Sequence, residues 1–195
     1  MAVGYSYAYT DSTELAEWNE ANQKPFIIKY NTDGTIDWWK YITIEIDFTT
    51  TFDSVIVIYG TNVNETRYVA VGGVTYSNGL TSGGVVATIN PITKTCNSLY
   101  SYEGIGLRFR SMAKNKNASG DIAVVGTNDR GGVIAYFKQK TDKSSYEKVK
   151  SITNVVGNNS TGGLTGITTD TNQSDTYTVS GFNGNNGFMG TVVAK

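Results

Sequence analysis

Short runs of apolar residues, each about the length of a β-strand, recur along the chain in a regular order. Four of these runs end in a glycine that follows small or β-branched residues: Ala2-Val3-Gly4, Ala70-Val71-Gly72, Val124-Val125-Gly126 and Val179-Ser180-Gly181. The four glycines, called the repeated glycines below, are 68, 54 and 55 residues apart. A period of this size is typical of proteins built from a repeated supersecondary unit. We therefore expect four copies of one small sheet.

Each unit reads as four short strands joined by polar turns. The predicted first strands are Asp53–Ile58, Gly106–Ser111 and Leu164–Thr169, and the predicted fourth strands are Trp38–Ile42, Leu99–Tyr102 and Tyr146–Val149. The second strands end at the repeated glycines, and the third strands open near residues 25, 84, 132 and 187. Turn segments rich in Asn, Ser, Thr and Asp favour hairpin loops between first and second strands. The chain begins inside a second strand and ends after a third, which predicts three, four, four and three strands.

This inventory predicts an all-β, β-propeller-like fold of about four blades, each with three to four antiparallel strands. A four-way division gives roughly 49 residues per blade, close to the usual blade length of about 40 to 50. Closure into a ring would remove exposed sheet edges. Three other arrangements stay open: a piece of a larger ring, a ring completed by a second chain, and a β-sandwich whose strands resemble one another.

The most distinctive segment is Pro25-Phe26-Ile27-Ile28-Lys29-Tyr30-Asn31-Thr32-Asp33-Gly34-Thr35-Ile36-Asp37-Trp38. It resembles the repeat of the bacterial β-propeller family with SBBP-like repeats, which reads as an apolar strand, Lys-Tyr, an Asn/Asp-Gly turn and then Trp. The resemblance implies an extracellular, envelope or virion component that binds or scaffolds. About four units instead of seven is a departure from the family. The Asn- and Thr-rich, histidine-free sequence is also similar in style to virion or tail-associated proteins of tailed bacteriophages.

The glycines and tryptophans of these segments have predictable physical roles. Gly34, after Asp33, supplies a tight turn in which positive φ costs little. Either Trp38 or Trp39 is expected to pack between neighbouring sheets. The repeated glycines at 72, 126 and 181 are expected to let backbones or bulky neighbours approach where a side chain would collide. None of them lies between a strand and a helix, as a nucleotide-binding loop requires.

Composition limits the classes of function. The chain of 195 residues fits a single domain, 1–195, and 22 glycines with only two prolines suit short strands joined by polar turns. A net charge of -1 with scattered Lys and Arg provides no basic field for nucleic acid. The sequence has no run of about 18 apolar residues and no start like a signal peptide, so we expect no membrane insertion.

The absence of histidine excludes several catalytic schemes. A Ser-His-Asp triad, a Cys-His pair and the histidine-containing zinc sites cannot be built from this chain. Cys96 is single, so an intrachain disulfide is also impossible. We therefore predict no metal site and no cofactor, and any catalysis would rely on carboxylate, lysine or tyrosine side chains.

The first unit contains an insertion. Between Gly4 and Pro25 lie 20 residues, against 11 or five in the corresponding loops of the later units. Asp11 and Glu14 can cap a short helix, which predicts a helical insertion around residues 11–21. This insertion is either a binding loop, since ligand specificity often lies in such loops, or a lid over the axis or a sheet edge.

The candidate ligand-binding residues are Tyr5, Tyr7, Tyr9 and Trp18. The three tyrosines alternate along one strand and so project from one face, where they could grip sugar rings or pack at a blade interface. Trp18 lies in the predicted insertion.

Two further segments have a weaker chemical signal. Glu45 and Asp47 alternate along a strand and could form the carboxylate pair of a glycosidase, but we prefer to interpret them as the solvent face of an amphipathic strand. Residues 170–174 begin like a calcium loop, but Asp175 and Gly181 stand where that loop needs Gly and Glu. We interpret the latter segment as a turn.

The sequence thus predicts a non-enzymatic structural or assembly module built from propeller-type repeats, extracellular or virion-associated. Its expected partners are other protein subunits or further copies of itself, and nucleic acid is not expected. The alternative is a carbohydrate- or receptor-binding module that recognises a surface glycan with its loop face. A carboxylate-dependent glycoside hydrolase is the third hypothesis.

Overall fold

The computed structural model consists of β-strands joined by turns. It describes residues 1–7, 23–42, 48–60, 65–76, 82–103, 106–115, 120–141, 145–153, 162–169 and 176–193. Fourteen strands lie in these segments and form four antiparallel sheets, and no α-helix occurs among the described residues. The all-β prediction is therefore confirmed.

Each sheet is a meander in which consecutive strands are neighbours. The first sheet contains β1 (Ala2–Tyr7), β2 (Gln23–Tyr30) and β3 (Ile36–Tyr41). The second contains β4 (Phe48–Ile58), β5 (Arg67–Tyr76), β6 (Ser82–Ile89) and β7 (Cys96–Glu103). The third contains β8 (Arg108–Lys114), β9 (Ile122–Asn128), β10 (Gly131–Gln139) and β11 (Tyr146–Thr153), and the fourth contains β12 (Gly162–Thr169), β13 (Thr176–Asn183) and β14 (Asn186–Val193). Within the described ranges, the predicted strand counts of three, four, four and three are thus confirmed.

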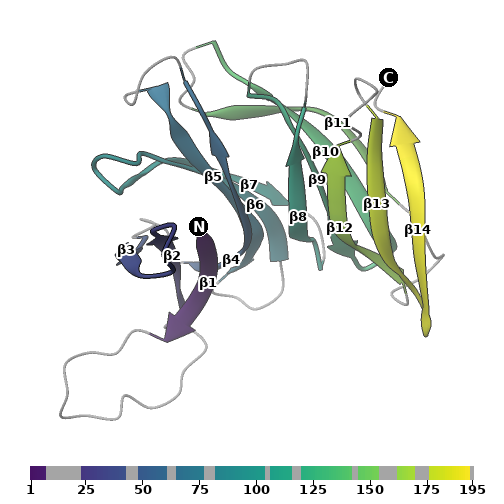
Figure 1. The fold of residues 1–195 in the computed structure, drawn as a ribbon. Coiled ribbons are helices and arrows are strands. Elements are labelled where there is room, and N and C mark those ends of the chain that lie inside the picture. The colour runs from purple at the N-terminus through teal and green to yellow at the C-terminus, as the bar shows by residue number, and fades with distance from the viewer. Residues whose placement is uncertain are drawn as a thin grey trace.

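The sheets pack one after another along the chain and are not closed into a ring (Figure 1). The first strand of each later sheet lies against the sheet before it: β4 against β1 and β2, β8 against β4, β5 and β6, and β12 against β8, β9 and β10. In Figure 1 the order runs from the purple first sheet on the left to the yellow β14 on the right, and the chain ends lie on opposite sides. Among the described residues, the closed ring of four sheets that we expected is therefore not formed.

Alternation of side chains explains the paired apolar residues before the repeated glycines. In β9, Val124 lies in the hydrophobic cluster shared with the second sheet, whereas Val125 lies in the cluster shared with the fourth sheet. Val133 and Ile134 of β10 divide in the same way. Successive residues of a strand point to opposite faces of its sheet. A strand between two sheets therefore needs apolar residues at consecutive positions.

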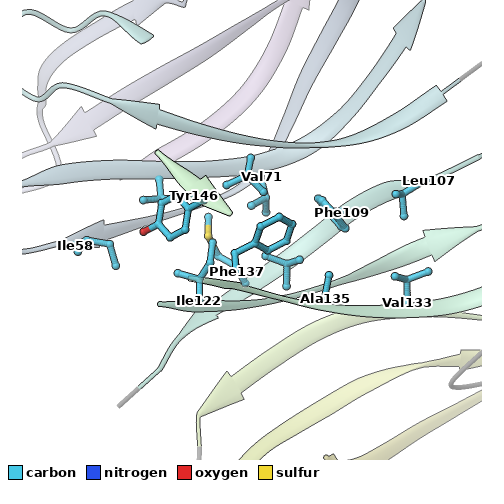
Figure 2. Packing of buried hydrophobic residues seen from close by; sticks show 13 residues of the cluster. Ile58, Val71, Leu107, Phe109, Ile122, Val133, Ala135, Phe137 and Tyr146 are labelled. Atoms are coloured by element: carbon cyan, nitrogen blue, oxygen red, sulfur yellow. The ribbon is translucent and has the colours of Figure 1, made fainter. Parts of the chain in front are cut away.

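The largest hydrophobic cluster lies between the second and third sheets (Figure 2). Phe109 and Phe137 meet edge to face there, with ring centroids 5.8 Å apart. Tyr146 donates a hydrogen bond from its hydroxyl to the carbonyl oxygen of Gly120 at 2.7 Å, and burial raises its phenol pKa above the ordinary value. Aromatic rings thus fill this interface while the buried hydroxyl keeps a partner.

The repeated glycines are required by close approaches between backbones. A Cβ at position 72, 126 or 181 would collide with a carbonyl oxygen of the neighbouring first strand. In each case that strand has a β-bulge beside the glycine, and the extra residue is Asp53, Arg110 or Thr165. A bulged strand bends locally, and the bend brings its backbone to the glycine. The predicted close approach is therefore confirmed at these three positions.

The turn of the distinctive segment 25–38 has the predicted geometry. Gly34 has a φ of 87°, and the Asp33 carboxylate accepts hydrogen bonds from the backbone N–H and the hydroxyl of Thr35, at 2.9 and 2.6 Å. After the turn, Trp38 stacks on Tyr68 of β5, with ring centroids 6.0 Å apart. The next residue, Trp39, is 57% exposed. Trp38 is thus the tryptophan that packs between sheets.

A salt bridge connects the second and third sheets. Arg108 donates from Nε and Nη2 to the two carboxylate oxygens of Asp53, each at 2.6 Å. Nη1 of Arg110 lies 3.5 Å from Oδ2 of the same carboxylate. Bidentate, charge-assisted pairs of this kind are among the stronger hydrogen-bonded contacts in proteins. Two of the three groups are the extra residues of bulges, so the bulges also place charges at the boundary between sheets.

Candidate functional site

The predicted ligand-binding residues lie largely beyond what the structure describes. Tyr5 and Tyr7 belong to β1, where their backbones pair with Pro25 and Gln23, but their side chains are not among those described. Tyr9 and Trp18 lie outside the described residues, as does the predicted helical insertion around 11–21. These candidates therefore stay predictions.

The remaining candidate residues also lie outside the described part of the chain. Glu45, Asp47 and the calcium-like segment 170–175 lie outside the described residues. Within the described ranges, no three His, Cys, Asp or Glu side chains come together as ligands for a metal ion. The same ranges contain no helix with the length and apolar character needed to span a membrane.

Cys96 is poorly suited to nucleophilic chemistry. Its Sγ donates to the carbonyl oxygen of Ser98 at 3.3 Å, and burial raises the pKa of the thiol to about 11. The thiolate is the reactive form of cysteine, and at neutral pH this thiol is almost entirely protonated. The side chain packs against the cluster between the first and second sheets, which indicates a structural role.

The clearest candidate surface is the side of the first sheet that points away from the second sheet. Ile27 is completely buried in the cluster shared with the second sheet. Alternation therefore places its neighbours Phe26 and Ile28 on the opposite side. Strand pairing adds a partner from β3 to each residue on that side. The resulting pairs are Phe26 with Tyr41, Ile28 with Trp39 and Tyr30 with Ile36, and we call these six residues the first outer face.

The first outer face is apolar, uncharged and accessible. Tyr30, Ile36 and Trp39 are 42%, 53% and 57% exposed. Trp39 meets Tyr41 edge to face, with ring centroids 5.4 Å apart. Scattered apolar residues are normal on a protein surface, but a contiguous patch of large ones marks an interaction site.

A second exposed face lies at the other end of the row of sheets. Val179 and Phe188 of the fourth sheet pack toward the third sheet, so alternation places Ser180 and Met189 on the far side. Phe182, Met189 and Val193 are 38%, 76% and 49% exposed. We call the described residues of β13 and β14 on this side the last outer face; they are Thr176, which is buried, and Thr178, Ser180, Phe182, Gly187, Met189, Thr191 and Val193.

The strand β14 is a free edge without the usual protection against pairing. In the described structure it pairs with β13 alone. Its sequence, NGFMGTVV, contains neither a charged residue nor proline, whereas the last strand of each other sheet, β3, β7 or β11, carries charged residues. Natural edge strands are commonly protected by charges or proline. The sequence of β14 instead resembles that of the interior strand β6, SGGVVATI.

Neither outer face was identified from the sequence, although a signal was present. Apolar residues at consecutive positions, as in Phe26-Ile27-Ile28, indicate a strand with two covered sides, and the first and fourth sheets each have one neighbouring sheet. The sequence supplies the first of these facts and the packing of the described sheets supplies the second, so the faces become visible only in the structure. Comparison with known proteins assigns no family to the chain: no family model matches the sequence, and no curated protein matches it.

Proposed function

We propose that the chain is a non-enzymatic assembly module built from propeller-type repeats, whose end sheets are covered by other protein subunits. The observation that carries the proposal is the first outer face. It presents six uncharged, mostly apolar side chains, three of them 42% to 57% exposed, on a sheet whose other side belongs to the core. An extracellular or virion-associated setting, as in a tailed bacteriophage, belongs to the same proposal and rests on the sequence resemblance and composition.

Covering the first outer face would favour association. Complete burial of a large apolar side chain contributes about 1.5–3 kcal/mol. The three most exposed members, Tyr30, Ile36 and Trp39, are each about half exposed, so covering them contributes on the order of 3 kcal/mol in total. Part of this offsets the entropy lost on association.

The packing of the sheets supports the propeller part of the proposal. Blades of a propeller are small antiparallel sheets arranged around a central channel. Here the first strands of the second, third and fourth sheets, β4, β8 and β12, make the contacts to the preceding sheets. In a complete ring the first sheet would also have a preceding neighbour, and the fourth a following one.

Carbohydrate binding is the second candidate, and the exposed aromatic side chains of the first outer face favour it. Sugar rings stack on flat, accessible aromatic faces. Trp39 and Tyr41, however, meet at an interplanar angle of 85°, so they do not form one flat platform. Edge-to-face pairs are typical of packed protein interfaces, which favours a protein partner.

The proposal is tested by measuring the solution mass of the chain with light scattering over a wide concentration range, together with hydroxyl-radical footprinting read residue by residue. A defined oligomer in which Trp39 is protected supports the assembly function. A monomer in which Trp39 is protected at every concentration contradicts it, because the chain itself would then cover the first outer face. A monomer that binds glycans, and loses this binding in Trp39→Ala, would establish the second candidate instead.

A further inference from the structure

We infer that the first outer face packs on the last outer face of a second copy of this chain, so that two copies associate head to tail into a ring of eight sheets. This inference rests on the proposed assembly function and names its partner.

One equivalent position in the third strand of each unit is buried by the following sheet, except in the fourth sheet. Ile27, Val86, Ile134 and Met189 pair with Val3, Val71, Val125 and Ser180, and each of these partners directly precedes a repeated glycine. The first three side chains are buried against the following sheet, with exposures of 0%, 2% and 0%. Met189 is 76% exposed, since the described chain provides no further sheet after the fourth.

The first outer face has the complementary gap: its residues have the positions that contact a preceding sheet in the other units. The residues that flank this position point toward the preceding sheet: Val85 and Ala87 in β6, Val133 and Ala135 in β10, and Phe188 in β14. In β2 the flanking residues are Phe26 and Ile28, and the described chain has no sheet before the first. The two outer faces are therefore the two halves of an interface that the chain already makes three times.

The two faces also fit each other chemically. The first outer face is made of bulky side chains, whereas the last outer face combines the bulky Phe182, Met189 and Val193 with small hydroxyl residues. Large residues facing small ones can interdigitate. The indole N–H of Trp39 and the tyrosine hydroxyls need partners when covered, and Ser and Thr hydroxyls can supply them. Neither face contains a charge that would have to be desolvated unpaired.

The number of copies follows from the size range of propellers. These rings typically contain 4–8 blades, and the described residues of one chain form four sheets that are not closed. Two chains give eight sheets, whereas three would exceed the range. The contact joins unlike surfaces, and such contacts form closed rings where the rotation between copies returns to the start.

The test uses one substitution on each outer face and a control substitution at an exposed residue that belongs to neither face. Trp39→Asp places a charge on the first outer face, Met189→Asp places one on the last outer face, and Val149→Asp changes a 65% exposed residue of β11 in the third sheet. All three positions are at least half exposed, so we expect the urea midpoints of the isolated chains to stay close to wild type. We expect wild type and Val149→Asp at twice the chain mass of 21.1 kDa. Both face variants should dissociate, with a dissociation constant raised at least ~100-fold by the buried unpaired carboxylate.

Mixing the two face variants distinguishes head-to-tail pairing from other dimers. A mixture of Trp39→Asp and Met189→Asp retains one intact first outer face and one intact last outer face on different chains. These should pair, and light scattering should show a dimer that neither variant forms alone. A dimer joined through two first outer faces would instead survive Met189→Asp and would not be restored by mixing.

The other possible outcomes overturn the inference, and they differ in their consequence for the proposed assembly function. A wild-type dimer that Met189→Asp leaves intact means that assembly occurs through a different contact, and the assembly function stands. A wild-type monomer with Trp39 open to hydroxyl radicals excludes the second copy as partner and leaves a different protein as the occupant. A monomer with Trp39 protected removes both the inference and the proposed function.

Discussion

Replacement of Gly126 by alanine tests the account of the repeated glycines. The added Cβ would lie 2.9 Å from both the carbonyl carbon of Arg108 and the Cα of Phe109, and closer still to the Arg108 carbonyl oxygen. These are backbone atoms of the bulged strand β8, so no side-chain rotation can relieve the collision. Ordinary contacts of a Cβ begin at 3.4 Å. The strands β8 and β9 must therefore separate locally, beside the fully buried Phe109.

The expected cost of Gly126→Ala is about 3 kcal/mol, the upper part of the range for overpacked cores. Gly190→Ala is the matched control, because Gly190 also lies in a strand, has no heavy atom within 4 Å of the added Cβ, and is not among the glycines with positive φ. It should leave stability unchanged or raise it by about 0.5 kcal/mol, since alanine lowers the entropy of the unfolded chain.

Urea unfolding at a fixed protein concentration measures both variants. With an m-value of about 2 kcal/mol/M, a loss of 3 kcal/mol lowers the midpoint by about 1.5 M. Equal midpoints for Gly126→Ala and Gly190→Ala would refute the reasoning, because the close approach of the two backbones would then carry no energetic consequence. The fixed concentration matters, because association also raises the apparent stability.

Four further predictions concern single side chains. Asp53→Asn should cost about 1–2 kcal/mol, because Arg108 then loses a bidentate carboxylate that is 14% exposed; a urea midpoint equal to that of wild type would contradict this. Phe109→Ala should cost about 3–5 kcal/mol, measured by the same assay, whereas Ile92→Ala, at a residue 52% exposed, should change stability by less than about 0.5 kcal/mol. Cys96, with its thiol pKa raised from 9.0 to about 11, should react with a thiol reagent at pH 8 about 100-fold more slowly in the folded chain than in the unfolded chain. Because the unfolded chain releases this proton first, stability should fall as the pH rises from 9 to 11, and Cys96→Ala should remove that part of the fall.

The strands were predictable because the signals that define them are local. The repeated glycines and the apolar runs before them indicated the second strands, and Asp33-Gly34 indicated a tight turn. Strand ends were less accurate: β4 begins at Phe48 instead of Asp53. The reason is the bulge at Asp53, whose extra residue interrupts the alternation in the middle of a continuous strand.

Ring closure and the outer faces could not be obtained from local patterns. Closure depends on the angle between successive sheets, which no periodicity in the sequence contains. Local patterns also cannot distinguish Trp38 from Trp39, because the two residues are adjacent and identical in type. Only the register with β2 shows which of them packs on the core. Met189 has the sequence context of a buried residue and is exposed because its sheet stands last in the row.

The serial packing of the sheets has a consequence for how the molecule opens. Among the described strands, the second and third sheets each have a neighbour on both sides, whereas the first and fourth each have one. In proteins whose units contact only their neighbours, stability is a sum of unit and nearest-neighbour terms. Amide hydrogen exchange in the dissociated chain should therefore be graded, slowest around Val71, Val124 and Val133 and faster toward both ends. A row of sheets of this kind unfolds locally from its ends inward. The amide protons that exchange last therefore report on the interface between the second and third sheets.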